Sequence, residues 1–145
     1  DIMLQMIDED TDYRMRQEDV VTRNILVVDD EQINYRIIAA IMNDEQEYKL
    51  TYTESGELAL EMLKENSYDL ILLDIMMSGM DGVETLRSIR ENSNVPVVLM
   101  SGDKTLDISG DFAKLGCNDY VTKPFLPMMI KEVIKNMSKK NGGLQ

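Results

Sequence analysis

Short runs of apolar residues alternate along the chain with stretches in which apolar residues recur every three or four positions. In the run that ends at Asp74, four aliphatic residues stand between an aspartate and this aspartate, and a glycine-containing loop follows. Such a run is typical of a short strand that is buried in a parallel sheet. A second run ends at Asp29, and residues 48–53 alternate in polarity like a strand nearer the edge. The pattern predicts strands over residues 24–29, 48–53, 69–74, 95–100 and 119–122.

The stretches between these strands have the spacing of amphipathic helices. The clearest apolar stripe belongs to the last helix and consists of Ile130, Val133, Ile134 and Met137. A similar stripe follows the first strand and consists of Ile33, Ile37, Ile38 and Ile41. The pattern predicts helices over residues 33–43, 56–66, 82–92, 103–115 and 130–140, of which 103–115 fits least well because Ser109-Gly110 interrupts it. This alternation predicts an α/β fold: a (βα)5 doubly wound, five-stranded parallel sheet in a three-layer, flavodoxin-like sandwich.

Polar residues that could carry chemistry stand at the carboxyl ends of four predicted strands. They are Asp29 and Asp30, Asp74, Ser101 and Lys123. In a parallel sheet these ends open on one edge, where α/β proteins bind their ligands. The carboxylates predict a pocket for a hard cation such as Mg²⁺. A lysine and a hydroxyl beside that cation could hold a phosphoryl group, and the Asp74 carboxylate could act as a nucleophile that forms an acyl phosphate.

Composition narrows the choice of function. The 145 residues carry a formal net charge of −12, which argues against nucleic acid or an anionic membrane as a direct ligand and suits a cation. No apolar run approaches the roughly 20 residues that span a bilayer, so no membrane insertion is expected. The chain has no histidine, so any phosphohistidine must come from another molecule or from a segment outside this sequence. The single cysteine, Cys117, excludes an internal disulfide and fits a reducing compartment such as the cytoplasm.

Taken together, the residues at the strand ends give the chain a family resemblance. Over about residues 23–140 it resembles the receiver domain of two-component response regulators (CheY-like proteins). The matching residues are 27–31, Asp74 with 77–82, 101–102, Gly116 and 120–125. The resemblance implies a signalling module of the phosphorelay type, with phosphorylation and dephosphorylation of its own side chain as its only catalysis. It is not expected to be an enzyme that acts on a metabolite.

The resemblance also implies a role for each residue of the site. Asp74 would accept a phosphoryl group from the phosphohistidine of a histidine kinase or phosphotransfer protein. Asp30 and Asp74 would hold Mg²⁺ together with the carbonyl oxygen of Met76, and Asp29 would help mainly through water. Lys123 would bind the phosphoryl oxygens.

A switch is implied as well. Ser101 would move toward the phosphoryl group and Tyr120 would turn inward, which would change the surface formed by the fourth helix, the fifth strand and the fifth helix. The Lys123-Pro124 bond is expected to be cis.

Two positions depart from the family pattern. Position 78 is Ser where such domains usually have Pro, and position 102 is Gly where Ala is usual. With the Ser109-Gly110 interruption, the second departure predicts a shortened or mobile fourth helix, which puts a standard output surface in doubt.

The ends of the chain are predicted to lie outside the domain. Residues 1–23 would form an extension or linker, residues 24–140 the receiver domain and residues 141–145 a tail. An apolar group near the start could pack against a second copy in a homodimer, and it consists of Ile2, Met3, Leu4, Met6 and Ile7. Residues 31–34 resemble receivers fused to hybrid histidine kinases, but a stand-alone regulator or one cut from a larger protein fits as well.

Three other functions fit the sequence less well. A pseudo-receiver would bind partners without phosphorylation, against which the complete set of acidic, hydroxyl and lysine residues argues. A haloacid-dehalogenase-like phosphatase would need a second aspartate two residues after its nucleophile, where Met76 stands. A flavodoxin-like cofactor binder would need a phosphate-cradling loop after the first strand, and the acidic residues 29–31 oppose an anionic ligand there.

Overall fold

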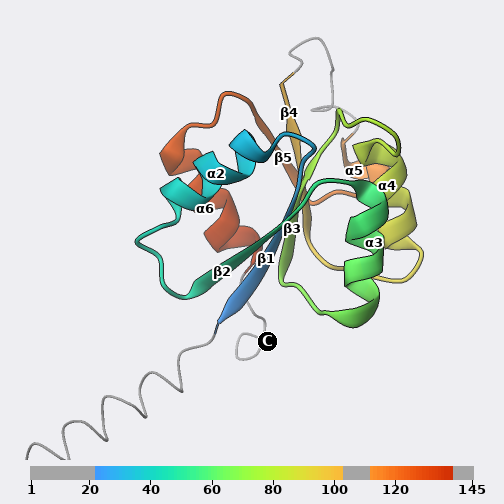
Figure 1. Cartoon of the computed structure of the whole chain (residues 1–145), viewed down its shortest axis with the longest axis horizontal. Coiled ribbons are helices and arrows are strands. Elements are labelled where there is room, and N and C mark those ends of the chain that lie inside the picture. The colour runs from blue at the N-terminus through green and yellow to red at the C-terminus, as the bar shows by residue number, and fades with distance from the viewer. Residues whose placement is uncertain (1–21, 103–111, 139–145) are drawn as a thin grey trace, which may run out of the picture.

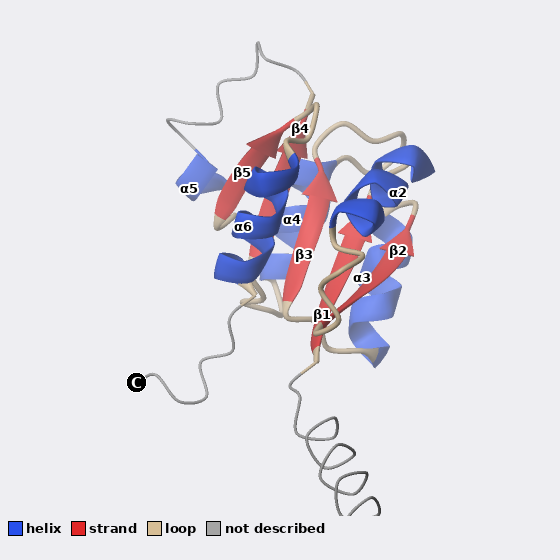
Figure 2. Ribbon diagram, turned by 90° about the vertical axis from the view of Figure 1, so that its left-hand side faces the viewer, coloured by secondary structure: helices blue, strands red, loops and turns tan. Residues whose placement is uncertain are grey.

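Five parallel strands form one sheet in the order β2-β1-β3-β4-β5. The computed structural model describes residues 22–102 and 112–138, in which helices cover both faces of this sheet (Figures 1 and 2). The strands are β1 (Arg23–Val28), β2 (Tyr48–Thr53), β3 (Leu70–Asp74), β4 (Val97–Ser101) and β5 (Asp119–Thr122). The helices are α2 (Gln32–Ile41), α3 (Gly56–Glu65), α4 (Gly82–Arg90), α5 (Phe112–Leu115) and α6 (Pro127–Met137). The predicted doubly wound α/β class is therefore confirmed.

Successive residues of the central strands serve opposite faces of the sheet, as the two-residue period of a strand requires. On β1, Ile25 and Val27 join the core that packs under α2 and α6. The alternate residues Leu26 and Val28 join the core under α3 and α4. Because both faces are covered by helices, central strands of this kind read as continuous apolar runs.

Helix α2 buries only part of the isoleucine stripe that the sequence showed, namely Ile38 and Ile41. Ile38 is fully buried, but Ile33 is 57% exposed and Ile37 is 40% exposed. The inner face is instead completed by Met42, just beyond the helix, and by the partly buried Tyr35 and Ile41. The helical spacing of the four isoleucines is confirmed, but an aromatic residue takes part of the inner face, so Ile33 and Ile37 lie outside the core.

Several element boundaries differ from the predicted ones by a few residues. Strand β4 begins at Val97, so Pro96 precedes the strand and is not its second residue. Helix α6 begins at Pro127, where proline is favoured because the first helical N–H has no partner within the helix. Of the predicted helix over 103–115, the structure describes 112–115 as helical, and the expected shortening falls on residues 103–111, outside the described part. The Lys123-Pro124 bond is cis, as expected.

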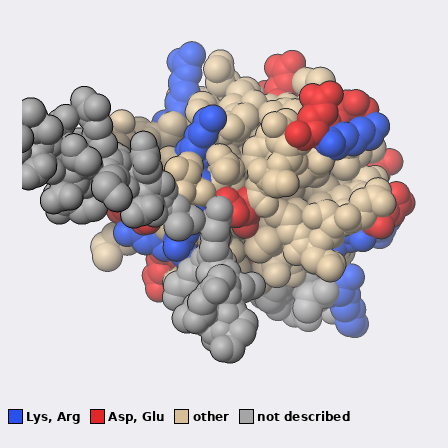
Figure 3. All heavy atoms as spheres, turned by 90° about the horizontal axis from the view of Figure 1, so that it is seen from below, with Lys and Arg blue, Asp and Glu red and all other residues tan. Residues whose placement is uncertain are grey.

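Charged side chains of both signs lie on the surface, and the helices are too short or too polar to cross a bilayer in the part of the chain that the structure describes. Seen from the amino ends of the strands, the surface not covered by grey atoms carries both acidic and basic side chains (Figure 3). No helix in the described residues has the length and apolarity that a bilayer crossing requires.

Candidate functional site

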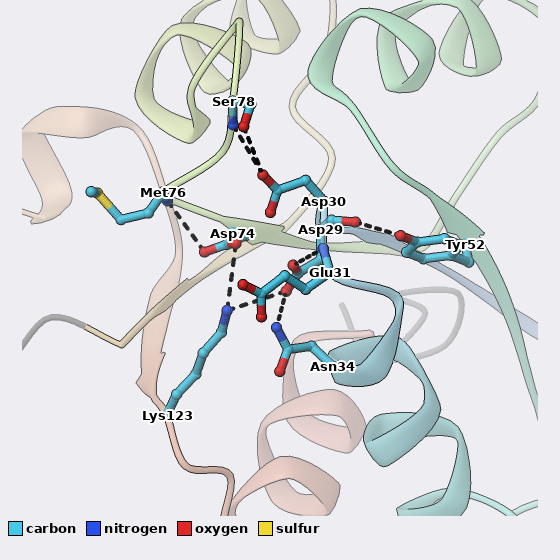
Figure 4. Close-up of polar contacts among 9 residues, drawn as sticks. All are labelled: Asp29, Asp30, Glu31, Asn34, Tyr52, Asp74, Met76, Ser78 and Lys123. Carbon is cyan, nitrogen blue, oxygen red and sulfur yellow. Dashed lines mark hydrogen bonds and ion pairs between the residues drawn. The ribbon is translucent and has the colours of Figure 1, made fainter.

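The functional side chains meet at the carboxyl edge of the sheet because the strands are in register there. Val28 of β1 pairs with Leu73 of β3, so Asp29 follows on beside Asp74. The structure brings Asp29, Asp30 and Asp74 together, with one carboxylate oxygen of each within 4.8 Å of the others. Figure 4 shows these carboxylates grouped above Lys123.

Lys123 joins the ends of the first, third and fifth strands. Its Nζ lies 3.2 Å from Oδ2 of Asp29 and 3.4 Å from Oδ2 of Asp74. Its backbone N–H donates to the carbonyl oxygen of Ser101 at 2.8 Å, which ties the loop after β5 to the end of β4. The ammonium therefore compensates two carboxylates that are almost completely buried.

Asp29 is fixed by hydrogen bonds that the sequence pattern does not predict. Its Oδ1 accepts the backbone N–H of Glu31 at 2.9 Å, and its Oδ2 accepts the Asn34 amide at 3.0 Å in addition to the lysine. The Tyr52 hydroxyl donates to its backbone oxygen at 2.7 Å. Both carboxylate oxygens of Asp29 are thus occupied by protein donors. The sequence offers one indication of these contacts: Asn34 is an amide residue in the first turn of the helix that follows the acidic pair.

Asp74 is a buried carboxylate whose proton affinity is altered by its surroundings. It is 3% exposed, and its Oδ1 accepts the backbone N–H of Met76 at 3.2 Å. Burial raises the pKa of Asp74 from 3.8 to about 6, and the negative charge of Asp29 adds to the rise, whereas Lys123 and the Met76 N–H oppose it. At neutral pH the side chain is therefore mostly ionised and can act as a nucleophile.

A cleft of about 480 Å³ opens onto Asp74 from solvent. It is lined by Glu31, Asp74, Met76, Gly102 and Lys123. The Met76 side chain is 61% exposed and points away from the carboxylates (Figure 4). A group the size of a phosphate can reach the Asp74 carboxylate through this opening.

The two predicted switch residues lie on neighbouring strands. Ser101 is the last residue of β4, is 3% exposed and pairs in register with Thr122 of β5. Tyr120 lies on β5 and packs partly buried against the core under α3 and α4. Both are close in the sheet to Lys123, but their movement stays a prediction.

The family model of the response regulator receiver domain matches residues 25–135. The chain belongs to this family. This receiver domain is 36% identical over 121 residues to the transcriptional regulatory protein ResD of Bacillus subtilis, which covers 79% of the chain and 49% of ResD. It spans about half the length of the curated relatives that it matches first.

Solved receiver domains have the same fold. The receiver domain of the Francisella response regulator 1452 is 28% identical with a TM-score of 0.73, over 81% of this chain and 97% of that one. The receiver domain of the sensor histidine kinase PA1611 from Pseudomonas aeruginosa PAO1 is 25% identical with a TM-score of 0.72, over 81% and 98%. That structure has a magnesium ion coordinated in its active-site cleft.

The residues of this receiver domain fit a magnesium ion. Mg²⁺ prefers oxygen ligands and binds proteins through one or two carboxylates while it keeps several waters. The three carboxylates provide such oxygens, and the cleft beside them is open to water. Lys123 alone leaves this group of acids with an excess of negative charge, which a divalent cation would offset.

The start of α4 packs directly against the backbone of the acceptor. A Cβ on Gly82 would lie 2.2 Å from the carbonyl oxygen of Asp74 and 2.6 Å from Cα of Ile75. We therefore expect Gly82→Ala to lower the free energy of unfolding in urea by about 2 kcal/mol, because backbone must move to admit the methyl group.

Gly102→Ala is the matched control for this change. Within the part of the chain that the structure describes, its Cβ would meet only the Lys123 side chain, at 3.7 Å, which is an ordinary contact. The control should change the free energy of unfolding by less than about 0.5 kcal/mol. Equal effects of the two substitutions would show that the close approach at Gly82 does not limit stability.

Proposed function

We propose that the chain is a phosphoacceptor, in which Asp74 takes a phosphoryl group from the phosphohistidine of a histidine kinase or phosphotransfer protein. One observation above all supports the proposal. A carboxylate buried at the end of β3 lies 3.4 Å from the Lys123 ammonium, within 4.8 Å of two further carboxylates, and still opens onto a cleft. A buried carboxylate with this set of charges is suited to nucleophilic attack on phosphorus.

In the transfer step an oxygen of Asp74 bonds to phosphorus while the bond from phosphorus to the donor imidazole breaks. The imidazole keeps the electron pair of that bond and takes up a proton. Lys123 moves part of its interaction from Asp74 to the phosphoryl oxygens. Mg²⁺ would be held by Asp30, Asp74 and the carbonyl oxygen of Met76, with Asp29 acting mainly through water, and it would neutralise charge on the phosphoryl group.

The product of this step is a conformational state. Ser101 would turn its hydroxyl toward the new phosphoryl group, and Tyr120 would follow into the space that this leaves. A cavity of about 250 Å³ between β5 and α6 includes Tyr120, Met129 and Val133 in its lining. The surface between β5 and α6 would change when Tyr120 moves, and an output partner that binds this surface would distinguish the phosphorylated state from the unphosphorylated one.

Apolar side chains beside the cleft offer a place for the phosphodonor to dock. Ile33 is 57% exposed and follows Asp30 by three residues, and Leu126 is 59% exposed and follows Lys123 by three. Single exposed apolar residues are ordinary, but each of these follows a residue of the acidic site by three positions, so a partner that delivers a phosphohistidine to this site could contact both.

Intact mass after incubation with acetyl phosphate tests the proposal. The chain should gain one phosphoryl group in Mg²⁺ and none in EDTA, and hydroxylamine, which cleaves acyl phosphates, should remove it. Asp74→Asn should show no gain, whereas Asp69→Asn, at the other end of the same strand, should behave as wild type. A gain that survives in Asp74→Asn would place the acceptor elsewhere. Mg²⁺ binding without any gain from acetyl phosphate or a phosphorylated kinase would favour a pseudo-receiver.

A further inference from the structure

The loop between β3 and α4, residues 75–81, contacts Asp30 through Ser78. The backbone N–H of Ser78 donates to Oδ2 of Asp30 at 3.0 Å, and the Ser78 hydroxyl donates to the same oxygen at 3.3 Å. The residue at this position thus supplies two donors to one carboxylate oxygen (Figure 4). A proline, the usual residue in domains of this kind, has neither the N–H nor the hydroxyl.

Asp30 needs such contacts more than the other two acids of the site. Asp29 and Asp74 are buried and held by several donors, whereas Asp30 is exposed. An exposed carboxylate that no contact fixes samples several rotamers, and ordering it on binding costs conformational entropy. With Oδ2 directed at Ser78, the second oxygen of Asp30 lies on the side of Asp74 (Figure 4).

Ser78 is itself held in place by the rest of the loop. The backbone N–H of Met80 donates to Oε1 of Glu57, at the start of α3, at 3.1 Å. Gly79 lies between them with a φ of 74°, a left-handed conformation that glycine adopts without strain. The contact with Glu57 therefore ties the loop to α3 two residues after Ser78, and this limits the position of Ser78 independently of Asp30.

We infer that Ser78 is a positioning residue for the metal: its two hydrogen bonds hold Asp30 with one oxygen directed toward the Mg²⁺ position. This inference rests on the proposed function, in which the site takes Mg²⁺. Ligands of one Mg²⁺ at about 2.1 Å lie no more than about 4.2 Å apart. The carboxylate oxygens already lie within 4.8 Å of one another while the Ser78 contacts are made, so only a small shift separates them from a metal-binding arrangement.

Calorimetric titration of the protein with MgCl₂ alone tests the role of Ser78. Ser78→Ala, which keeps the N–H, should weaken Mg²⁺ binding about threefold, and Ser78→Pro, which removes both donors, about tenfold. Ser78→Thr retains both donors and should bind as wild type. Ser67→Ala, at the opposite edge of the sheet, is the matched control and should also bind as wild type.

A second readout separates positioning from a general loss of structure. The free energy of unfolding in EDTA should be nearly the same for wild type and Ser78→Ala, so that only metal binding changes. In amide NMR spectra, the Gly79 and Met80 signals should shift with Mg²⁺ at lower concentrations in wild type than in Ser78→Ala.

Unchanged or tighter Mg²⁺ binding in both Ser78→Ala and Ser78→Pro would overturn the inference, and tighter binding would mean that Ser78 competes with the metal. In that case a wild type that binds Mg²⁺, and loses it in Asp30→Asn, leaves the proposed function intact. A wild type that binds no Mg²⁺ would overturn the inference together with the metal part of the proposed function.

Discussion

Replacing Lys123 with methionine is expected to lower the free energy of unfolding at pH 7 by about 3 kcal/mol. The ammonium lies 3.2 Å from Asp29 and 3.4 Å from Asp74, and both carboxylates are at most 3% exposed. Methionine fills a similar volume but leaves two adjacent negative charges in a poorly solvated site. Urea unfolding in EDTA measures the change.

Two further measurements test whether the uncompensated carboxylates cause the loss of stability. Lys64→Met, which removes an exposed lysine paired with Glu61 at 3.0 Å on the surface of α3, should change the free energy of unfolding by less than about 0.5 kcal/mol. The deficit of Lys123→Met should also shrink between pH 7 and pH 5, because loss of the lysine raises the pKa of Asp74 further and its protonation removes one of the two charges. A deficit that does not depend on pH would point to lost packing of the lysine stem instead.

Replacing Asp74 with asparagine is expected to have the opposite effect, raising the free energy of unfolding at pH 7 by about 2 kcal/mol. The folded-state pKa of about 6 lies above the ordinary 3.8, because of burial first and the charge of Asp29 second. A carboxylic acid whose pKa is raised by folding stabilises the folded state fully only below its unfolded pKa. Wild type should therefore lose stability as the pH rises from about 4 to about 6. The difference between the pKa of 3.8 and the folded-state pKa of about 6 corresponds to about 3 kcal/mol in the free energy of unfolding. Asp74→Asn gains less than this, because it also loses the ion pair with Lys123.

Urea unfolding of wild type and Asp74→Asn between pH 4 and pH 7, in EDTA, checks this prediction. The two curves should meet near pH 4 and separate as the pH rises. Glu65→Gln, at the exposed end of α3, should follow wild type throughout. Parallel curves for wild type and Asp74→Asn would show that Asp74 ionises in the folded protein as it does in the unfolded chain.

In the Asp74→Asn background, Lys123→Met should lower the free energy of unfolding by less than it does alone, because only one buried carboxylate then loses its cation.

The strands and the acids at their ends could be predicted from the sequence because each depends on local pattern. The apolar run before Asp74 is fixed by burial on both faces of the sheet, and a parallel sheet leaves its carboxyl ends on one edge whatever the order of the strands. The same rule brought Lys123, far along the chain, to the Asp29 carboxylate.

Contacts that depend on how loops and helices are placed in space could not be predicted in this way. Asn34 is an ordinary polar residue in the sequence, and Ser78 stands out there only as a departure from the family pattern. Their hydrogen bonds to the acidic pair depend on where α2 begins and on the path of the loop before α4. Arg90 is a further case, since its guanidinium donates to the carbonyl oxygen of Gly116 at 2.8 Å and to the Asn118 side chain at 3.1 Å. In the sequence it is only a charged residue at the end of a helix.

The position of Lys123 directly after the last strand has a consequence for synthesis of the protein. A growing chain leaves the ribosome with Asp29 and Asp74 well ahead of the lysine that compensates them. A sheet made only of β2, β1, β3 and β4 would enclose both carboxylates without a cation, which is unfavourable in a poorly solvated interior. Docking of β5 at the edge of the sheet is therefore the step that allows the acidic centre to close, and until then its carboxylates are best left in water.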